Sequence, residues 1–284
     1  MQMIAFSHNG IPGIGILSQG VLHGRLSCDA DYPGDLDDLI GKQGPDWSAA
    51  AAPSGIRPFA LDEIHYRPPF TRPNKIVCVG LNYRDHTEEA GYKQPDYPTL
   101  FTRFTTSLVA HNDRIVRPRA SAALDFEGEL VAVIGRAGRH IALDRALSHV
   151  AGYSIFNDGS IRDFQHRTPQ WTVGKNFDAT GAFGPVFVTA DELPAGARGL
   201  RLETRLNGAT VQSSNTSLLI FDVATLVATV SEAMTLLPGD LIVTGTPAGI
   251  GHTRNPKLYM KPGDVVEVEI EGIGILRNTI ADED

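Results

Sequence analysis

The chain has 284 residues, of which 42% are hydrophobic and 20% are charged, an ordinary composition for a globular protein with one large β-rich domain or two smaller ones. Acidic residues outnumber basic ones by 33 to 25, and the net charge of -8 argues against an extended surface for nucleic acid or for an anionic membrane. Because the chain starts without a basic segment and a long apolar run, and has no stretch able to span a bilayer, we expect a cytoplasmic protein with no membrane partner.

The first part of the chain is expected to form a small N-terminal β domain, residues 1–70. Short apolar runs broken by glycine predict strands at 11–17 and 21–26, and a short helix is expected at 35–40. Residues 41–58 are rich in Gly, Pro, Ala and Ser and have the composition of a loop. The second domain, residues 71–284, is expected to carry the catalytic and metal-binding residues.

Strands dominate the second domain. Residues 265–270 alternate apolar and acidic side chains, as a half-buried antiparallel strand does, whereas 217–237 has apolar residues at helical spacing. Helices are few and strands are unevenly spaced, so we expect a β-rich α+β fold, a mixed sheet rolled around a core, and not a doubly wound βαβ sheet. The other expected strands are 75–79, 124–134, 151–158, 185–188, 200–206, 241–244 and 275–279.

Two glutamates on one expected strand give the first sign of chemistry. Glu127 and Glu129 are two residues apart, so their side chains point to the same face of the strand. Asp158 ends the next apolar strand along the chain. Like charges at such close range are unfavourable unless a cation or a shared proton lies between them, and an all-oxygen site suits a hard cation such as Mg²⁺. The alternative is a solvated strand face with surface acids.

A His–Glu pair is expected on a short helix at 84–90. Asn82 can cap this helix and Gly91 can end it. His86 and Glu89 are three residues apart and share a helix face, where a carboxylate can fix the imidazole tautomer and raise its basicity. Such a pair can act as a general base for water, although a simple surface contact is the alternative.

Three further segments offer polar groups to the same place. A short helix at 159–165 follows Asp158 and puts Arg162 and Gln165 on one face. Lys175 follows Gly174 in an apolar setting, where a lysine beside acids can stabilise a developing oxyanion. Thr246 lies in a glycine-rich turn that can approach a ligand closely, but this turn is not a nucleotide-binding P-loop because the Lys-Ser/Thr ending is absent.

Taken together, these segments resemble the fumarylacetoacetate hydrolase family. Five signatures occur in the order that the family has them, within about residues 74–278. They read Gly-Leu-Asn-Tyr-Arg-Asp-His, Asp-Phe-Glu-Gly-Glu-Leu, Asn-Asp-Gly-Ser-Ile-Arg-Asp-Phe-Gln, Trp-Thr-Val-Gly-Lys-Asn-Phe-Asp and Thr-Gly-Thr-Pro-Ala-Gly.

The resemblance implies a role for each candidate residue. Three are ligands of Mg²⁺ or Mn²⁺, two activate water, one is the catalytic lysine, and three surround the oxo-acid head of a small-molecule substrate. In that order they are Glu127, Glu129 and Asp158; His86 and Glu89; Lys175; and Arg162, Gln165 and Thr246. The resemblance also implies the family's mixed β-sheet roll and a homodimer.

The chain departs from the family pattern near the expected pocket. Arg103 stands where many members carry lysine, and Gly159-Ser160-Ile161 replaces a commoner Val-Thr/Ser-Ala. Because arginine favours bidentate contact with planar oxygens, we expect Arg103 to bind a second polar or anionic group at the far end of the substrate. The alternative is a bridge from Arg103 to a surface acid.

The leading hypothesis is a metal-dependent hydrolase that cleaves a C–C bond in an acylpyruvate-like 2,4-dioxo acid and releases pyruvate and an acid. The alternative within enzymes is a decarboxylase of a 2-oxo diacid such as oxaloacetate, or a hydratase or isomerase, because one scaffold hosts several reactions. A third hypothesis is a catalytically silent ligand-binding domain, against which the His86, Glu89 and Lys175 set argues, since binding alone requires no general base.

Overall fold

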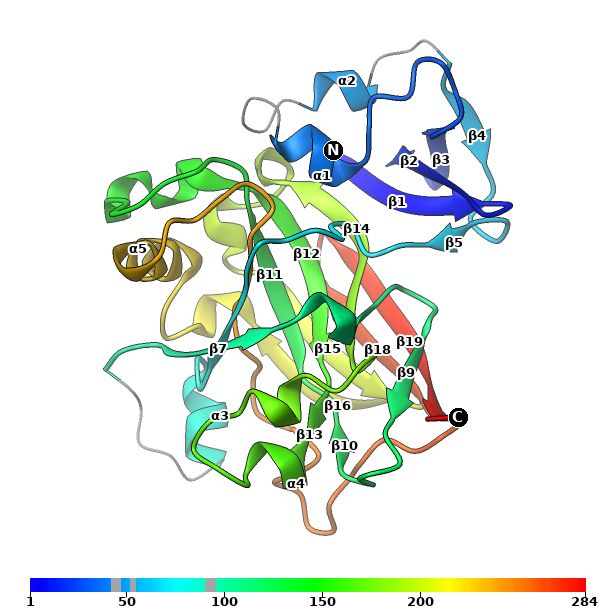
Figure 1. Ribbon diagram of the computed structural model, residues 1–284. Helices are drawn as coiled ribbons and strands as arrows, with labels where there is room; N and C mark the ends of the chain where they lie inside the picture. Colours follow the sequence, from blue (N-terminus) through cyan, green and yellow to red (C-terminus); the bar gives the residue numbers. More distant parts are fainter. Residues whose placement is uncertain (42–46, 52–54, 90–95) are drawn as a thin grey trace.

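The computed structural model describes residues 1–41, 47–51, 55–89 and 96–284, and its main element is one large mixed sheet (Figure 1). The sheet order within these residues is β4-β3-β2-β1-β14-β12-β11-β17-β6-β7, while β5 pairs with β1 and β8 with β14. Most neighbours are antiparallel, but β17–β6 and β14–β8 are parallel. The strands are β1 (Gln2–His8), β2 (Ile11–Ser18), β3 (Val21–Leu26), β4 (Arg57–Phe59), β5 (His65–Tyr66), β6 (Ile76–Gly80), β7 (Thr99–Arg103), β8 (Leu108–Val109), β11 (Gly128–Ile134), β12 (Val150–Asp158), β14 (Gly181–Thr189) and β17 (Leu241–Val243).

A second, smaller sheet packs against the centre of the large one, through contacts of β15 and β18 with β11 and of β18 with β12. The alternation expected for 265–270 is confirmed, because every second residue of β18 is buried. Its strands, in spatial order, are β16 (Ala209–Asn215), β15 (Arg201–Leu206), β18 (Val265–Ile270), β19 (Gly274–Asp282) and β9 (Arg114–Arg117), and a separate pair is formed by β10 (Leu124–Asp125) and β13 (Ser160–Ile161).

Helices are short and lie around the sheets. The helix expected at 217–237 forms only over α5, because Asp222 caps its first turn by accepting a hydrogen bond from Thr225 N and the chain is extended again at Met234. No helix in the described residues is long and apolar enough to cross a bilayer. The helices are α1 (Leu36–Gly41), α2 (Ser48–Ala51), α3 (Arg84–Glu89), α4 (Arg162–Gln165) and α5 (Val223–Ala233), with 3₁₀ turns η1 (Thr105–Ser107), η2 (Leu143–His149), η3 (Val173–Lys175), η4 (Ala190–Glu192), η5 (Ala195–Ala197) and η6 (Thr216–Leu218).

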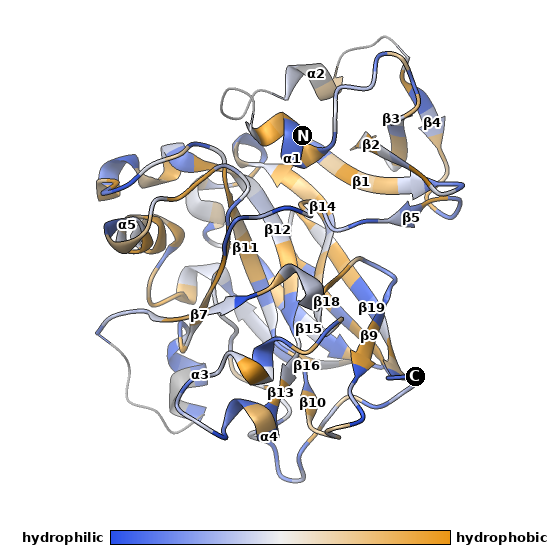
Figure 2. Cartoon of the chain, in the orientation of Figure 1, coloured by the Kyte–Doolittle hydropathy of each residue, from blue (hydrophilic) through white to orange (hydrophobic). Residues whose placement is uncertain are grey.

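The core lies on both faces of the central strands. Every residue of β11, β12 and β14 is buried, which explains their nearly continuous apolar sequences (Figure 2). Leu130 and Ala132 on β11 pack with the small sheet and α5, whereas Val131 and Val133 point the other way, toward α1 and Trp47. The β-rich α+β fold with a mixed sheet is therefore confirmed.

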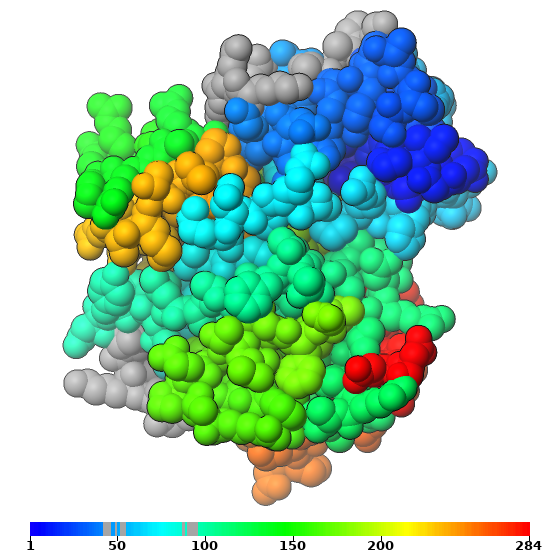
Figure 3. Space-filling view, in the orientation of Figure 1, coloured from blue at the N-terminus to red at the C-terminus, as the bar shows by residue number. Residues whose placement is uncertain are grey.

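The N-terminal strands continue the large sheet. Gln2 and Met3 of β1 pair with Val188 and Phe187 of β14, and the N-terminal segment forms the lobe at the top of Figure 3. The division of the chain at residue 70 stays a prediction. Of the loop expected at 41–58, residues 42–46 and 52–54 lie outside the described residues, while the remainder includes α2 and the start of β4. Residues 90 and 91, the expected end of the 84–90 helix, also lie outside them.

Candidate active site and metal centre

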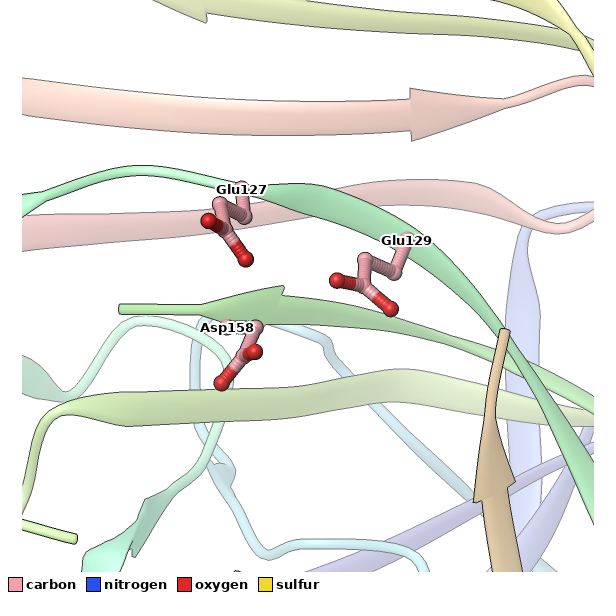
Figure 4. A group of neighbouring side chains, drawn as sticks. All are labelled: Glu127, Glu129 and Asp158. Atoms are coloured by element: carbon pink, nitrogen blue, oxygen red, sulfur yellow. The ribbon is translucent and has the colours of Figure 1, made fainter. Parts of the chain in front are cut away.

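Glu127, Glu129 and Asp158 come together in the structure, as the sequence predicts. Glu127 immediately precedes β11, Glu129 lies on it, and Asp158 ends the neighbouring β12. The pairing of Gly128 with Asn157 and a 2.8 Å hydrogen bond from Asp158 N to Glu127 O set this register. One carboxylate oxygen from each residue lies within 4.8 Å of the others, and all three residues are buried (Figure 4). The solvated strand face is therefore excluded.

Buried cations surround two of the three carboxylates. Lys175 Nζ lies 2.6 Å from Glu127 Oε2 and 2.7 Å from Asp158 Oδ2, and Arg162 lies 2.7 Å from Glu127 Oε1. Burial opposes ionisation of Glu127, but Lys175 and Arg162 outweigh it and lower the pKa of Glu127 to about 2. These contacts keep Glu127 negatively charged.

Glu129 has no such cationic partner among the described residues. Its carboxylate accepts a hydrogen bond from Gly245 N, and its pKa lies well above the ordinary value because of burial and of the nearby Asp158 and Glu127. Four buried acids, Asp125, Glu127, Glu129 and Asp158, thus face three buried cations, Arg103, Arg162 and Lys175. The cluster lacks one positive charge, and an all-carboxylate donor set fits a divalent cation such as Mg²⁺ or Mn²⁺.

Lys175 reaches the carboxylates because the backbone before it packs very closely. It ends η3 and is 1% exposed. A Cβ atom added at Gly174 would lie 2.3 Å from Gln165 N, so only glycine allows this approach of η3 to α4. Burial opposes the charge of Lys175, but Asp158 and Glu127 raise its pKa, so it remains an ammonium group.

His86 and Glu89 share one face of α3, as expected from their spacing. His86 Nδ1 lies 3.7 Å from Glu89 Oε2, an electrostatic contact that is too long for a hydrogen bond. Glu89 also accepts a 3.0 Å hydrogen bond from Gly249 N, which ties α3 to the glycine-rich turn after β17. Burial opposes ionisation of Glu89, yet the contacts with His86 and Gly249 lower its pKa. His86 therefore has a carboxylate behind it and a cavity in front of it.

Arg162 offers an unused donor at the same cavity. Its Nε atom donates to Asp125 at 2.8 Å and its Nη1 atom to Gln165 Oε1 at 2.9 Å. Its Nη2 atom is buried and has no hydrogen-bond partner among the described residues. An unpaired buried guanidinium N–H is costly, and Arg162 itself lines the cavity.

Thr246 lines the cavity, but much of its hydroxyl is already used. Its Oγ1 donates to Gly128 O at 3.0 Å and accepts from Gln212 Nε2 at 2.8 Å. One lone pair remains, so toward a substrate Thr246 can only accept a hydrogen bond.

The expectation for Arg103 requires a correction. Its side chain is fully buried at the end of β7 and does not line the cavity. It pairs with Asp158 Oδ1 and donates to Gly159 O at 3.0 Å and to Thr180 Oγ1 at 2.9 Å. Arg103 ends β7 and pairs with the buried carboxylate of Asp158, so it lies outside the residues that line the cavity and its partner is not a surface acid.

One cavity of about 250 Å³ connects these groups. Its polar wall includes His86, Glu127, Glu129, Arg162 and Lys175. Gly80 makes room for one side of it, because a Cβ atom there would lie 2.2 Å from the Trp171 ring. The apolar wall consists of Val79, Leu81, Phe101, Trp171 and Ile250. A small acid with a polar head and a short carbon chain fits this lining.

Sequence reasoning missed four residues around the site. Asp125 is fully buried and accepts from Arg162 and from the backbone of residues 251 and 252, and Gln212 holds Thr246. A charged residue inside the apolar run Leu-Asp-Phe was the available signal for Asp125. His166 and His252 also line the cavity, but they lie in loops, where no periodicity marks them.

Comparisons with known proteins show the family of this chain. Residues 75–281 match the model of the fumarylacetoacetate hydrolase C-terminal domain. The mitochondrial oxaloacetate tautomerase of Homo sapiens is 43% identical over 220 residues, which cover 77% of this chain and 70% of that protein. A fumarylacetoacetate hydrolase from Exiguobacterium antarcticum is 37% identical, with a TM-score of 0.85 and full coverage of both chains. A 2-hydroxyhepta-2,4-diene-1,7-dioate isomerase from Mycobacterium marinum is 33% identical, with a TM-score of 0.77 over 100% of this chain and 99% of that one.

Proposed function

The chain belongs to the fumarylacetoacetate hydrolase family, and we propose that it is an isomerase that interconverts the keto and enol forms of a 2-oxo diacid such as oxaloacetate. The observation that carries the proposal is the Nη2 atom of Arg162, which has no hydrogen-bond partner among the described residues, beside a cluster of four buried acids and three buried cations. A substrate with an acid head would give Arg162 Nη2 an acceptor, while a divalent cation, to which the neighbouring oxo group can bind, would supply the missing positive charge. The names of the tautomerase and the isomerase favour this reaction over the C–C hydrolysis expected from the sequence, although the similar Exiguobacterium antarcticum protein is named a hydrolase.

Glu127, Glu129 and Asp158 would hold the divalent cation, Mg²⁺ or Mn²⁺. When bound, this ion would act as a Lewis acid that polarises the 2-oxo group. Arg162 would hold the 1-carboxylate through Nη2, and Lys175, which stays charged, would donate a hydrogen bond to the oxygen on which negative charge develops.

His86 would move the proton. It would accept a proton from C3 of the diacid, and the same imidazolium would return it to the 2-oxo oxygen, so no atom is gained or lost. Glu89, on the other side of the ring, would stabilise the imidazolium. The apolar wall of Phe101 and Trp171 would keep water away from the enol.

C–C hydrolysis of a 2,4-dioxo acid is the second candidate, and the His86–Glu89 contact favours it. A histidine backed by a carboxylate can deprotonate water as well as carbon. In that reaction water would attack the 4-carbonyl, and Lys175 would stabilise the resulting oxyanion.

The test follows both reactions with one protein preparation. Enol oxaloacetate is monitored by its ultraviolet absorbance and an acylpyruvate by loss of its own absorbance, with Mg²⁺, with Mn²⁺ and after EDTA treatment. We expect metal-dependent loss of the enol and little or no acylpyruvate cleavage. Efficient cleavage with no tautomerisation would select hydrolysis, and full activity after EDTA would refute the metal site.

We also propose that the protein forms a homodimer and that it is located in the cytoplasm. Light scattering coupled to size-exclusion chromatography distinguishes a dimer from the 30.6 kDa monomer.

A further inference from the structure

Two histidines outside the catalytic set line the cavity, and we refer to His166 and His252 as the histidine pair. His166 follows α4 and is exposed, whereas His252 lies in the loop after β17 and is half-buried. Their ring centroids are 5.1 Å apart, with 31° between the ring planes. The hydrogen bonds of Glu127, Glu129 and Asp158 within the described residues go to other groups, so the pair is separate from the metal centre.

The neighbours of His252 fix its tautomer. Its Nδ1 atom lies 3.3 Å from Lys257 Nζ and 2.8 Å from Tyr259 Oη. An ammonium group can only donate, so the Lys257 contact favours the neutral ring with a lone pair on Nδ1 and the proton on Nε2. His252 therefore has an Nε2–H donor that these two contacts leave available.

The electrostatic surroundings of the pair favour an anion. Burial first, and then nearby positive charge from Arg162 and Lys257, lowers the pKa of His252 to about 4 and also lowers that of His166. The acids that face the pair, Asp125 and Glu127, are both paired with Arg162. Burial is the larger cause of both shifts, and the positive charges of Arg162 and Lys257 beside the pair would attract a negatively charged ligand group.

Asp125 links the pair to the head-group donor. Its Oδ2 atom accepts from Arg162 Nε at 2.8 Å and from His252 N at 2.9 Å. Its Oδ1 atom accepts from Gly251 N at 2.8 Å. One buried carboxylate therefore holds both Arg162 and the loop of His252, so the separation of the two donors is fixed in the fold.

We propose that the histidine pair binds the second carboxylate of a 2-oxo diacid whose oxo-acid head is held by Arg162 and the metal centre. The proposal rests on the proposed function for the identity of the head group. It assigns the choice of a diacid over a monoacid to His252 Nε2–H, with His166 alongside it at the cavity mouth.

A binding experiment tests this assignment without any turnover. Malate carries both carboxylates of oxaloacetate and does not react by this chemistry, and 2-hydroxybutyrate lacks only the second carboxylate. Titration calorimetry with the Mg²⁺-loaded full chain is expected to show that His252→Leu weakens malate binding about 10- to 100-fold and leaves 2-hydroxybutyrate binding unchanged. His252→Gln, which retains an N–H near the Nε2 position, is expected to recover most of the malate affinity.

A kinetic experiment uses the reacting counterparts, oxaloacetate and 2-oxobutyrate, and follows deuterium exchange at C3 by NMR. His252→Leu is expected to lower kcat/KM about 10- to 100-fold for the diacid alone, mainly through KM. His8→Leu, a change on β1 outside the cavity, is the matched control and is expected to match the parent.

The two experiments separate the two proposals. If the parent binds malate through His252 but exchanges neither substrate, the proposed function fails and the diacid subsite stands. Equal losses for diacid and monoacid in His252→Leu, or no loss for either, would overturn the subsite. A lower melting temperature with unchanged discrimination would assign the pair to packing and would overturn it as well.

Discussion

Arg103 and Lys175 bind opposite oxygens of the same carboxylate: Arg103 pairs with Oδ1 of Asp158 and Lys175 with Oδ2. Lys175 lines the cavity, whereas Arg103 reaches Asp158 from the protein interior. Arg103 also stacks near Phe156, with its guanidinium 5.5 Å from the ring centroid, and is held by Ser107 and Thr180. Arg103 thus fixes the orientation of a candidate metal ligand without meeting the substrate.

Replacing Arg103 should therefore weaken metal binding more than substrate recognition. We expect Arg103→Met to lower Mn²⁺ affinity about 10- to 100-fold, because Asp158 loses the partner that orients it. Arg103→Lys keeps one charged donor and should lose less. Calorimetric titration with Mn²⁺ measures the affinity of both variants, and the melting temperature of each variant shows whether it is folded. Unchanged Mn²⁺ affinity in Arg103→Met would contradict this role.

Replacing Lys175 should separate metal binding from catalysis. Lys175 competes with a cation for Glu127 and Asp158, so Lys175→Met is expected to bind Mn²⁺ more tightly than the parent. Turnover should nevertheless fall by about 10²-fold or more, since the oxyanion loses its donor. Parallel Mn²⁺ titrations and initial rates at saturating metal test this. A drop in both the Mn²⁺ affinity and the turnover rate would instead indicate that Lys175 holds Glu127 and Asp158 in position to bind the metal.

Metal binding should release a proton. Burial and the neighbouring acids raise the pKa of Glu129 well above its ordinary value, so a bound ion competes with a proton for this carboxylate. Affinity should therefore fall as the pH is lowered. Glu127 releases none, because its pKa is about 2. Calorimetry in two buffers of different ionisation enthalpy should show that metal binding releases protons, and more of them as the pH is lowered. No difference between the buffers would mean that Glu129 is already ionised.

Glu129→Gln should stabilise the metal-free protein while it weakens metal binding. The pKa of Glu129 is higher in the folded state than in the unfolded state, which lowers the free energy of unfolding at pH values above the ordinary pKa. The amide removes this cost and can still accept from Gly245 N. We expect the melting temperature at neutral pH to rise by roughly 2 °C or more. The exposed Glu63→Gln is the control, and a fall in Glu129→Gln would contradict the prediction.

Sequence reasoning found the residues of the site whose signals are local. Glu127 and Glu129 follow from a period of two and His86 with Glu89 from a helical period, and both groupings exist in the structure. The alternation of apolar and acidic residues also predicted the strand β18 and which of its faces is buried. When both residues lie on one strand or one helix, the period of that element is enough to predict that their side chains share a face.

Contacts between elements that are far apart in the sequence could not be predicted from local patterns. Arg103 was expected at the pocket because its charge type suits an anion, but only the pairing of β7 with β6 decides which way it points. His252 lies beside His166 in a loop that Asp125, far away in the sequence, holds by a hydrogen bond from His252 N. No local pattern encodes these contacts, which arise when segments far apart in the sequence are packed together.

The position of β17 has a consequence for how the site is completed during synthesis. β17 lies between β11 and β6 in the large sheet, although it follows them by more than a hundred residues in the chain. On the ribosome, β6, α3, β11, β12 and η3 all emerge before β17. Until residue 243 is available, β6 has no partner strand on the side that faces β11 in the complete sheet. A nascent chain stalled before β17 should hold its carboxylates in place while His86 is still undocked, and ribosome-bound chains of increasing length would show the histidine joining last.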